Sequence, residues 1–506
     1  MNVGIDLGTT YSLIARMEPD GTPTLLPDHT DPTLVATPSV VYLGKDCAIV
    51  GQLVATMVEE NPEIKTIEFF KRRFGDTKPI FFDDRGNPWY AESIAALVLR
   101  KLVFDAESFT AGRVDSAVIT VPAHFNDLQR KGVLAAAGLA ELPVLGLLEE
   151  PVAAALHYGI SQGAQDQVLL VYDLGGGTFD ATVLSLDAKG VYVLAKEGLT
   201  NLGGKEFDEK LGAMVLERFE RAGLSPNLNA RTLQQLRRAS EEIKFELCIP
   251  GKTQDRRVVM LGTQSVEVRI SRADFEREVE SLIAETETVT RRCVQGAGLQ
   301  LQELNAVLLV GGSSLVPAIG ERIRKMMGPA ASRVKFHEPM RAVAYGAAMH
   351  TAMLTGTAEK YSLPPELRGV TGYHVGVRIV DPRTGRVRID PLIKKNMPLP
   401  ARAHKTYYTS HPDQQRMALE IVQYLSTDDE MIALGRLVVG PLPSPKANYP
   451  IEVMVENRED GTVEVRAYDP QTRIELNQAF SRESDDVFGH LASQRLLVKG
   501  TVLNNV

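Results

Sequence analysis

Two glycine-rich segments that each follow an apolar stretch carry the clearest chemistry in this sequence. They are residues 4–10 (GIDLGTT) and 173–180 (DLGGGTFD). Glycine lets backbone N–H groups approach phosphate oxygens without a Cβ in the way, and a threonine hydroxyl adds one more donor. Asp6 and Asp173, one at the mouth of each loop, could hold Mg²⁺ through its water shell. The two segments together predict a site for nucleotide phosphates and their metal.

One such segment alone is weak evidence, because an ordinary hairpin turn explains it equally well. The same order of apolar strand, Asp-Leu-Gly and then Thr recurs far along the chain. This recurrence favours two similar α/β lobes that each present one loop to a shared cleft.

The segments around these loops alternate between helical and strand patterns. Apolar residues recur at helical spacing in residues 91–104 and 128–140, with a strand-like run at 117–121 between them. A second apolar run, 306–310, ends in Gly-Gly-Ser and precedes a helix expected over 317–327. The alternation is typical of an α/β fold, and the third glycine segment could form another phosphate or ribose loop.

The pattern changes after residue 354. Residues 355–370 are polar and are broken by prolines and glycine, which predicts a linker. From 371 to 480 the period becomes two, and Asp460-Gly461 marks a hairpin turn, so we expect an antiparallel β domain there. The remaining residues, 481–506, predict a short tail with room for one strand or one short helix.

The composition restricts the function classes. The chain has 506 residues, 44% of them hydrophobic, and a formal net charge of −8, which argues against nucleic acid or anionic lipid as a principal partner. Three dispersed cysteines predict neither a disulfide framework nor a zinc site. The amino terminus has no signal-peptide pattern and the apolar runs are too short for a membrane span. We therefore expect a cytoplasmic protein.

Several motifs together resemble the seventy-kilodalton heat-shock chaperone family of the bacterial DnaK type. They occur in the order GIDLGTTYS, FFKRRFGD, VPAHFND, EEPVAAALHYG, DLGGGTFD, LGGKEFD and LLVGGSS, and YPIEVMVENREDGTVEVRAYD extends the resemblance into the β domain. The resemblance implies an actin-like ATPase domain with two ribonuclease-H-like lobes over 1–354, followed by a β-sandwich domain that binds peptides.

The resemblance also implies roles for single residues. Lys71 falls on the catalytic lysine that reaches the γ-phosphate, and Glu150 on the glutamate that senses this phosphate. Asp6, Asp173 and Thr178 complete the catalytic set, with Thr178 aligning the attacking water. Two alternatives stay open from the residues alone: Lys71 as a solvated lysine in a basic cluster, and Glu150 as a helix-start carboxylate before a proline.

The implied ligands are ATP or ADP with Mg²⁺, and K⁺ nearby. Mg²⁺ is expected, through water, at Asp6, Asp173 and Asp180. The nucleotide contacts are expected at Gly8, Thr9, Thr10, Tyr11, Gly175, Gly176, Gly177, Gly203, Gly204, Glu241, Lys244, Phe245, Cys248, Gly311, Gly312, Ser313 and Leu315.

The adenosine end departs from the family pattern. Glu241 and Lys244, at i and i+3 of a helix expected over 233–247, match the ribose contacts, with a surface salt bridge as the rival interpretation. Phe245 and Leu315 stand where the family has two arginines that cover the adenine, and Cys248 replaces a serine. A ring and an aliphatic side chain could still enclose a purine, so we expect weaker binding or a changed base preference.

Three further departures concern coupling between the domains. The linker lacks the family's apolar run of leucines, so the sequence leaves open whether it docks onto the ATPase domain. Gly146 replaces the arginine that meets a J-domain co-chaperone, although Asp127 and Arg130 remain. The 481–506 tail is too short for the family's helical lid, which predicts fast peptide exchange.

The sequence therefore favours a lidless, slow, ATP-dependent chaperone that controls the binding of extended hydrophobic segments of unfolded polypeptides. A J-domain co-chaperone and a nucleotide exchange factor are candidate partners. One alternative is a nucleotide-gated scaffold or sensor with negligible turnover. Another is a small-molecule kinase on the same fold, which leaves the β domain unexplained.

Overall fold

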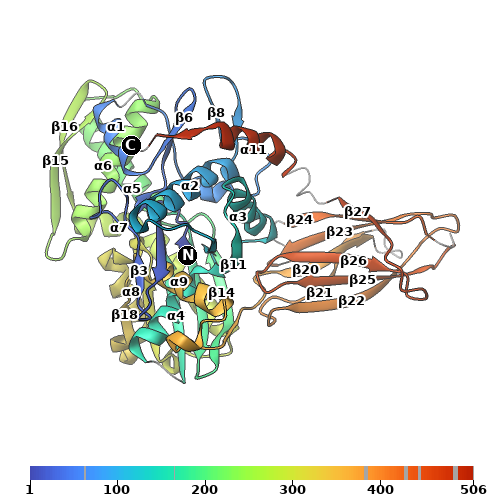
Figure 1. Cartoon of the computed structure of the whole chain (residues 1–506). Coiled ribbons are helices and arrows are strands. Elements are labelled where there is room, and N and C mark those ends of the chain that lie inside the picture. The colour runs from blue at the N-terminus through green and yellow to red at the C-terminus, as the bar shows by residue number, and fades with distance from the viewer. Residues whose placement is uncertain are drawn as a thin grey trace.

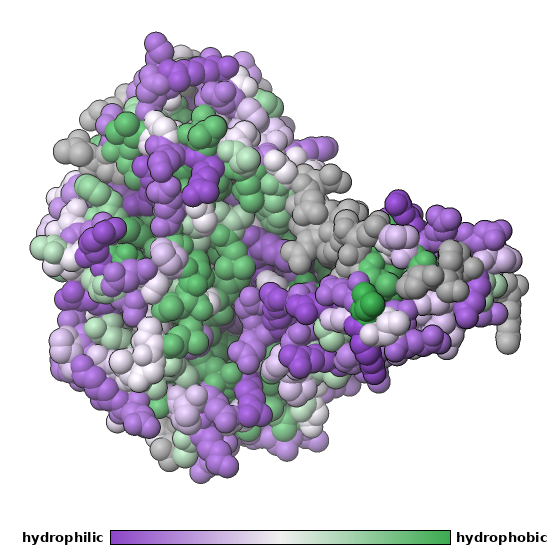
Figure 2. All heavy atoms as spheres, turned by 45° about the vertical axis from the view of Figure 1, so that its right-hand side comes forward, coloured by the Kyte–Doolittle hydropathy of each residue, from purple (hydrophilic) through white to green (hydrophobic). Residues whose placement is uncertain are grey.

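The chain forms a large α/β body from which a β region projects as an arm (Figure 1). The computed structural model describes residues 1–506 except 62–63, 164–165, 381–385, 427–430, 443–445, 482–487 and 505–506. The visible face of the arm carries mostly hydrophilic residues (Figure 2).

The first sheet of the body contains the strand that leads into the first glycine loop. This strand, residues 2–6, and its parallel neighbour, residues 116–121, are nearly continuous buried apolar runs, as expected for parallel strands covered on both faces. β11, β10 and β1 are parallel, whereas β2 and β3 return antiparallel. The sheet order is β11 (Val144–Glu149), β10 (Ser116–Val121), β1 (Asn2–Asp6), β2 (Tyr11–Met17) and β3 (Pro23–Leu25), with β4 (Thr37–Pro38) also paired to β2.

The second sheet repeats this arrangement around the second glycine loop. Three parallel strands are again followed by two antiparallel ones, and a sixth strand is added at the far edge. The match of order and direction agrees with the recurrence of the glycine segments. The order is β18 (Val334–Phe336), β17 (Ala306–Val310), β12 (Gln167–Leu174), β13 (Phe179–Leu186), β14 (Gly190–Leu199) and β19 (Glu366–Arg368).

Two helices, α4 and α9, connect the cores of the two sheets. One buried apolar cluster contains residues of both helices together with residues of both sheets. At their crossing a Cβ on Gly346 would lie 1.9 Å from the backbone oxygen of Ala153, so only glycine permits this approach. The helices of the body are α1 (Gln52–Glu60), α2 (Ala91–Thr110), α3 (Asp127–Leu139), α4 (Glu150–Gln162), α5 (Gly204–Arg221), α6 (Ala230–Cys248), α7 (Arg272–Gly296), α8 (Pro317–Met327) and α9 (Ala342–Leu354).

Smaller sheets decorate the body. A hairpin of β15 (Gln254–Leu261) and β16 (Gln264–Ser271) lies beside α6, and β8 (Phe81–Phe82) pairs with β9 (Pro88–Trp89). A further sheet contains β28 (Val502–Leu503), β6 (Cys47–Val50), β5 (Val41–Leu43) and β7 (Thr66–Ile67).

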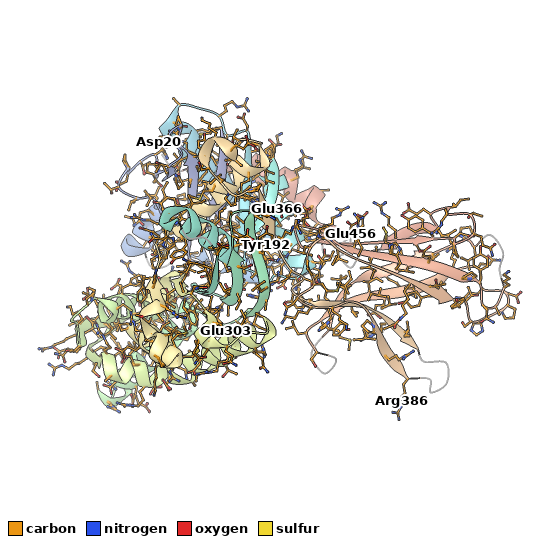
Figure 3. All side chains as sticks on the ribbon, turned by 90° about the horizontal axis from the view of Figure 1, so that it is seen from below. Asp20, Tyr192, Glu303, Glu366, Arg386 and Glu456 are labelled. Carbon is orange, nitrogen blue, oxygen red and sulfur yellow. The ribbon has the colours of Figure 1, made fainter. Side chains whose placement is uncertain are left out.

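The segment after α9 docks onto the body, a point that its missing leucine run left open. β19 pairs in parallel with β14, and the Tyr192 hydroxyl donates to Glu366 at 3.3 Å (Figure 3). Leu363 and Val370 are buried in the core that α4 and α9 share. Backbone hydrogen bonds and spaced apolar side chains hold the segment, so no contiguous apolar run is needed.

The β region consists of two antiparallel sheets that share one core. The predicted hairpin at Asp460-Gly461 is confirmed: it joins β25 to β26, and Gly461 has a φ of 78°. One sheet contains β21 (Val387–Ile393), β20 (His374–Val380), β23 (Met417–Tyr424), β24 (Ile432–Val439) and β27 (Asn477–Ser481). The other contains β22 (Ala401–Tyr408), β25 (Pro450–Asn457) and β26 (Val463–Tyr468).

The β region contacts the body through the start of α3. The Asp127 N–H donates to Gln423 at 3.1 Å, and the Val463 N–H donates to the Asp127 carboxylate at 2.7 Å. The Arg130 guanidinium donates to the backbone oxygen of Asp460 at 3.0 Å. The hairpin of the β region therefore lies directly on the first turn of α3.

The C-terminal segment returns to the first sheet's side of the body. α11 (Leu491–Gly500) packs against α2 and α3, and β28 pairs in parallel with β6. The Arg100 guanidinium donates to the carbonyl of Val498 at 2.6 Å, which satisfies one of the last carbonyls of the helix. The β region is thus attached on both sides, by β19 to the second sheet and by α11 to the first.

A buried carboxylate lies under this C-terminal segment. Glu92 of α2 accepts the Gly75 N–H at 3.0 Å through Oε1. Its Oε2 has no hydrogen-bond partner in the described part of the chain and lies 4.0 Å from Nε2 of His490. Burial raises the pKa of Glu92 from 4.5 to about 7.

We expect Glu92→Gln to stabilise the protein at pH 8 and several times less at pH 5. The folded state holds the Glu92 proton more tightly than the unfolded chain does, so stability is lost as the pH rises from 4.5 through 7. At about 1.4 kcal/mol per pKa unit, the gain at pH 8 is at most about 3.5 kcal/mol. Urea unfolding at both pH values measures it, with Glu278→Gln on the exposed face of α7 as a control that gains nothing. Equal gains at the two pH values would contradict the assignment.

Candidate nucleotide site

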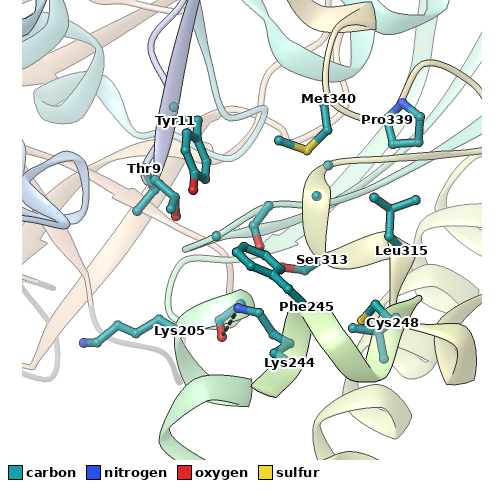
Figure 4. Close-up of a pocket in the computed structure, with 18 of the residues that line it drawn as sticks. Thr9, Tyr11, Lys205, Lys244, Phe245, Cys248, Ser313, Leu315, Pro339 and Met340 are labelled. Atoms are coloured by element: carbon teal, nitrogen blue, oxygen red, sulfur yellow. Dashed lines mark hydrogen bonds between the residues drawn. The ribbon is translucent and has the colours of Figure 1, made fainter. Parts of the chain in front are cut away.

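A cavity of about 920 Å³ is lined by residues of both sheets and of both glycine loops. The end at these loops is called the inner end, and Figure 4 shows part of the lining. The structure brings together most residues that the sequence singled out. Those that line the cavity are Asp6, Gly8, Thr9, Thr10, Tyr11, Lys71, Glu150, Asp173, Gly175, Gly176, Thr178, Gly204, Glu241, Lys244, Phe245, Cys248, Gly311, Gly312, Ser313 and Leu315.

The two glycine loops lie against each other. A Cβ on Gly176 would lie 1.9 Å from the Thr10 hydroxyl, so only glycine allows the loops to meet. The Ser313 hydroxyl donates to the carbonyl of Gly175 at 2.8 Å, which joins the third glycine segment to the second. The two glycine loops and the third glycine segment are thus in direct contact with one another along the cavity.

Three predicted residues lie behind the cavity lining. Gly177 packs against Thr9, and the Gly203 N–H donates to Glu206 at 2.8 Å. Asp180 is buried and pairs with Nδ1 of His124 at 2.6 Å. These three residues support the loops from outside the cavity.

Three carboxylates and one lysine occupy the inner end of the cavity: Asp173 and Glu150 are buried, and Asp6 is half-buried. Lys71 Nζ lies 2.6 Å from Glu150 Oε1, and Lys71 is only 2% exposed. Burial and the nearby Glu150 raise the pKa of Asp6 to about 7, and burial and the neighbouring carboxylates raise that of Asp173 well above its usual range. Burial likewise raises the pKa of Glu150. One lysine does not balance this charge, so the oxygen set suits a hard cation such as Mg²⁺ beside Asp6 and Asp173.

The burial of Lys71 contradicts its interpretation as a solvated lysine. It lies on a short 3-10 helix, η1 (Phe70–Arg73), and points into the cavity. Glu150 is the first residue of α4, as its helix-start interpretation requires, but it is also buried and bound to Lys71. Both side chains are placed to act on a group at the inner end.

The outer end of the cavity is built on the last turns of α6. Lys244 is buried and pairs with Asp208 at 2.8 Å. The alternative interpretation of Glu241 and Lys244, as a surface salt bridge, is therefore wrong. Burial raises the pKa of Cys248 to about 11, so its thiol stays protonated. Phe245 lies between Tyr11 and Leu315 in the view of Figure 4, and all three side chains line the cavity.

A set of contacts across the cleft was not predicted from the sequence. Arg72 donates two hydrogen bonds to Glu206, at 2.7 and 2.8 Å, and this pair joins η1 to α5. Phe69 has a φ of 55°, which is strained for a bulky side chain, and its ring lies 5.5 Å from Lys205 Nζ and from the Arg237 guanidinium. The basic and aromatic residues were visible in FFKRRFGD, but their partners lie far away in the sequence.

The loops, the acidic cluster and the cleft define a nucleotide-binding α/β protein of the phosphotransfer type. The family model described as Hsp70 protein matches residues 2–487. The chaperone protein DnaK of Thermotoga neapolitana is 35% identical over 476 residues, which cover 92% of this chain and 78% of that protein. The chaperone protein DnaK of Thermosipho africanus is 33% identical over 488 residues, covering 95% and 79%.

The chain belongs to the Hsp70 family. It is an ATP-dependent molecular chaperone and an ATPase, with ATP or ADP and Mg²⁺ as its ligands. Within the described residues, none of the helices combines the length and the apolar character that a membrane span needs.

Proposed function

We propose that this cavity hydrolyses ATP and that the β region binds extended polypeptide under its control. The body, residues 1–354, then acts as an actin-like ATPase domain with two lobes, and 371–480 acts as a peptide-binding β-sandwich. Residues 355–370 connect the two, and 481–506 form the tail. The glycine loops would hold the phosphates, Asp6 and Asp173 would hold Mg²⁺ through water, and Thr178 would orient the attacking water.

Lys71 supplies the positive charge that phosphoryl transfer needs. Its amine is buried and fixed by Glu150, so it requires little reorganisation when charge develops on the phosphoryl oxygens. Glu150 lies next to Glu149, which accepts hydrogen bonds from Arg130 and Lys196. A movement of Glu150 at the phosphate end would therefore act directly on Glu149, which belongs to the contact between the body and the β region.

The contact of Arg130 with both sides carries the proposed coupling. One guanidinium nitrogen donates to Glu149 at 2.7 Å and another to the carbonyl of Asp460 at 3.0 Å. The hairpin of the β region and the strand that leads into Glu150 thus share one buried side chain. A nucleotide that shifts Glu150 would bias the position of the β region.

Binding of a fluorescent extended apolar peptide tests this proposal. We expect ATP with Mg²⁺ to change the dissociation rate of the peptide by at least about fivefold relative to ADP, since coupling energies are typically 1–3 kcal/mol. Fluorescence anisotropy after addition of excess unlabelled peptide measures the rate. Identical rates with ATP, with ADP and without nucleotide would contradict the proposal.

The part-buried pair of Arg72 and Glu206 across the cleft is expected to slow nucleotide release. Arg72→Ala removes both hydrogen bonds to Glu206 and should speed the release of bound ADP by about tenfold, as expected for a lost charged hydrogen bond. Stopped-flow displacement of labelled ADP measures this rate. Arg238→Ala provides the control, because that arginine forms an exposed pair with Glu242 on the same helix as Phe245. Equal release rates in the wild type and Arg72→Ala would show that the pair does not hold the cleft.

Co-chaperones are proposed as partners in general terms only. Gly146 in β11 provides no side chain for the arginine-mediated contact that the family pattern uses with J-domain proteins. We keep the cytoplasm as the proposed location, since Cys47, Cys248 and Cys293 are all free and a reducing compartment suits them.

A further inference from the structure

We propose that the outer end of the cavity holds a purine base by stacking and van der Waals contact alone, so that the protein binds adenine and guanine nucleotides with similar affinity. This inference rests on the proposed nucleotide site and specifies which substrates that site accepts.

Exposed apolar side chains gather at this end. Phe245, Ile249, Leu315 and Met340 all line the same cavity, and each is between 37% and 50% exposed. A contiguous exposed apolar patch inside a cavity indicates a ligand that covers it. Figure 4 shows Phe245, Leu315 and Met340 around the open centre of the cavity.

The position of the phosphate loops identifies the occupant as a base. Gly204 donates through its N–H to the carbonyl of Gly175, and its own carbonyl accepts from Lys244 at 3.4 Å. Phe245 and Cys248 follow Lys244 along α6. A ligand with its phosphates at the loops and its ribose near Lys244 therefore places its base against Phe245.

The polar side chains at this end are poorly placed to read a base edge. Arg272 donates to the carbonyls of Leu247 and Ile249, at 2.8 and 2.7 Å, so its guanidinium is already engaged at the end of α6. The Cys248 thiol is a weak donor and a weak acceptor. Glu321 and Arg324 also line the cavity, but both are exposed on α8. The Ser313 hydroxyl already donates to the carbonyl of Gly175, and Lys244 is paired with Asp208.

A site of this kind discriminates weakly between purines. Strong discrimination requires buried polar groups that the wrong ligand leaves unpaired, and it reaches about 10⁴-fold or more where such groups exist. An aromatic face instead accepts every base, because every base has a π-face. The affinity is then set by the phosphates, the ribose and the ring of Phe245.

Calorimetric titration of the full chain with ADP, GDP and inorganic pyrophosphate, each with Mg²⁺, tests the inference without turnover. We expect the dissociation constants of ADP and GDP to agree within about tenfold. Phe245→Ala should weaken both by about tenfold and leave pyrophosphate unchanged. Phe245→Leu, which keeps apolar bulk without the aromatic face, should fall between the wild type and Phe245→Ala. Phe82→Ala, an exposed phenylalanine outside the cavity, provides the matched control and should bind all three ligands as the wild type does.

Two kinds of outcome would overturn the inference. ADP binding more than about tenfold tighter than GDP, or an effect of Phe245→Ala on only one nucleotide or on neither, overturns the inference and leaves the proposed ATPase intact. If neither ADP nor GDP binds, the proposed nucleotide site fails, and the inference fails with it.

Discussion

Lys71→Ala is expected to reduce the rate of ATP hydrolysis by about 10²–10³-fold, the usual cost of removing one fixed group that stabilises transition-state charge. The lysine is buried, lines the cavity beside the glycine loops and lies 2.6 Å from Glu150. The variant should still bind nucleotide, because the substitution leaves the glycine loops and Lys244 unchanged. Single-turnover hydrolysis with Mg²⁺ measures the first effect and calorimetry the second.

Arg73→Ala is the matched control for Lys71→Ala. Arg73 lies on the same short helix η1, but its side chain is 48% exposed and pairs with Asp76 in solvent. Its removal should change the hydrolysis rate by less than about twofold, as expected for an exposed pair. Thermal unfolding of both variants verifies that they fold, since Lys71→Ala leaves Glu150 without its buried partner. If Lys71→Ala folds and hydrolyses ATP at the wild-type rate, the catalytic assignment of Lys71 is contradicted.

Arg130→Ala is expected to separate ATP hydrolysis from peptide binding. A coupling energy of 1–3 kcal/mol corresponds to a stimulation by peptide of about 5–150-fold, and this stimulation should fall to nearly one in the variant. Arg130 is buried and donates both to Glu149 and to the carbonyl of Asp460, so its loss breaks the shared contact. Lys196 still pairs with Glu149, so hydrolysis without peptide should change little.

Arg402→Ala controls for a general effect on the β region. Arg402 is exposed on β22 and pairs with Glu456 on the neighbouring strand. Its removal should leave peptide stimulation at the wild-type value. Steady-state ATPase assays over a peptide titration compare the two variants. Full stimulation of Arg130→Ala would show that the coupling passes through other contacts.

Local sequence signals identified the inner end of the site well. The order of apolar strand, Asp-Leu-Gly and Thr predicted both loops, because strand burial and glycine turns are set by neighbouring residues. Asp6, Asp173, Lys71 and Glu150 converge as expected. Asp208 pairs with Lys244. It was visible in the motif LGGKEFD, but nothing in the sequence indicated that the two residues pair.

Long-range contacts account for the remaining features. The pairing of Arg72 with Glu206 and the return of α11 to α2 and α3 join residues far apart in the sequence, and no local pattern specifies them. The docking of β19 was left open for a related reason. An edge strand is held largely by backbone hydrogen bonds, which any sequence except proline offers, so the absence of leucines did not exclude it.

Single-turnover hydrolysis of ATP by the wild-type chain, with and without a saturating extended apolar peptide, tests the central claim most directly. The buried route from Glu150 through Glu149 and Arg130 to the β hairpin predicts that the peptide accelerates hydrolysis by about fivefold or more. Hydrolysis at a rate that the peptide leaves unchanged would contradict the claim that the two regions work as one chaperone.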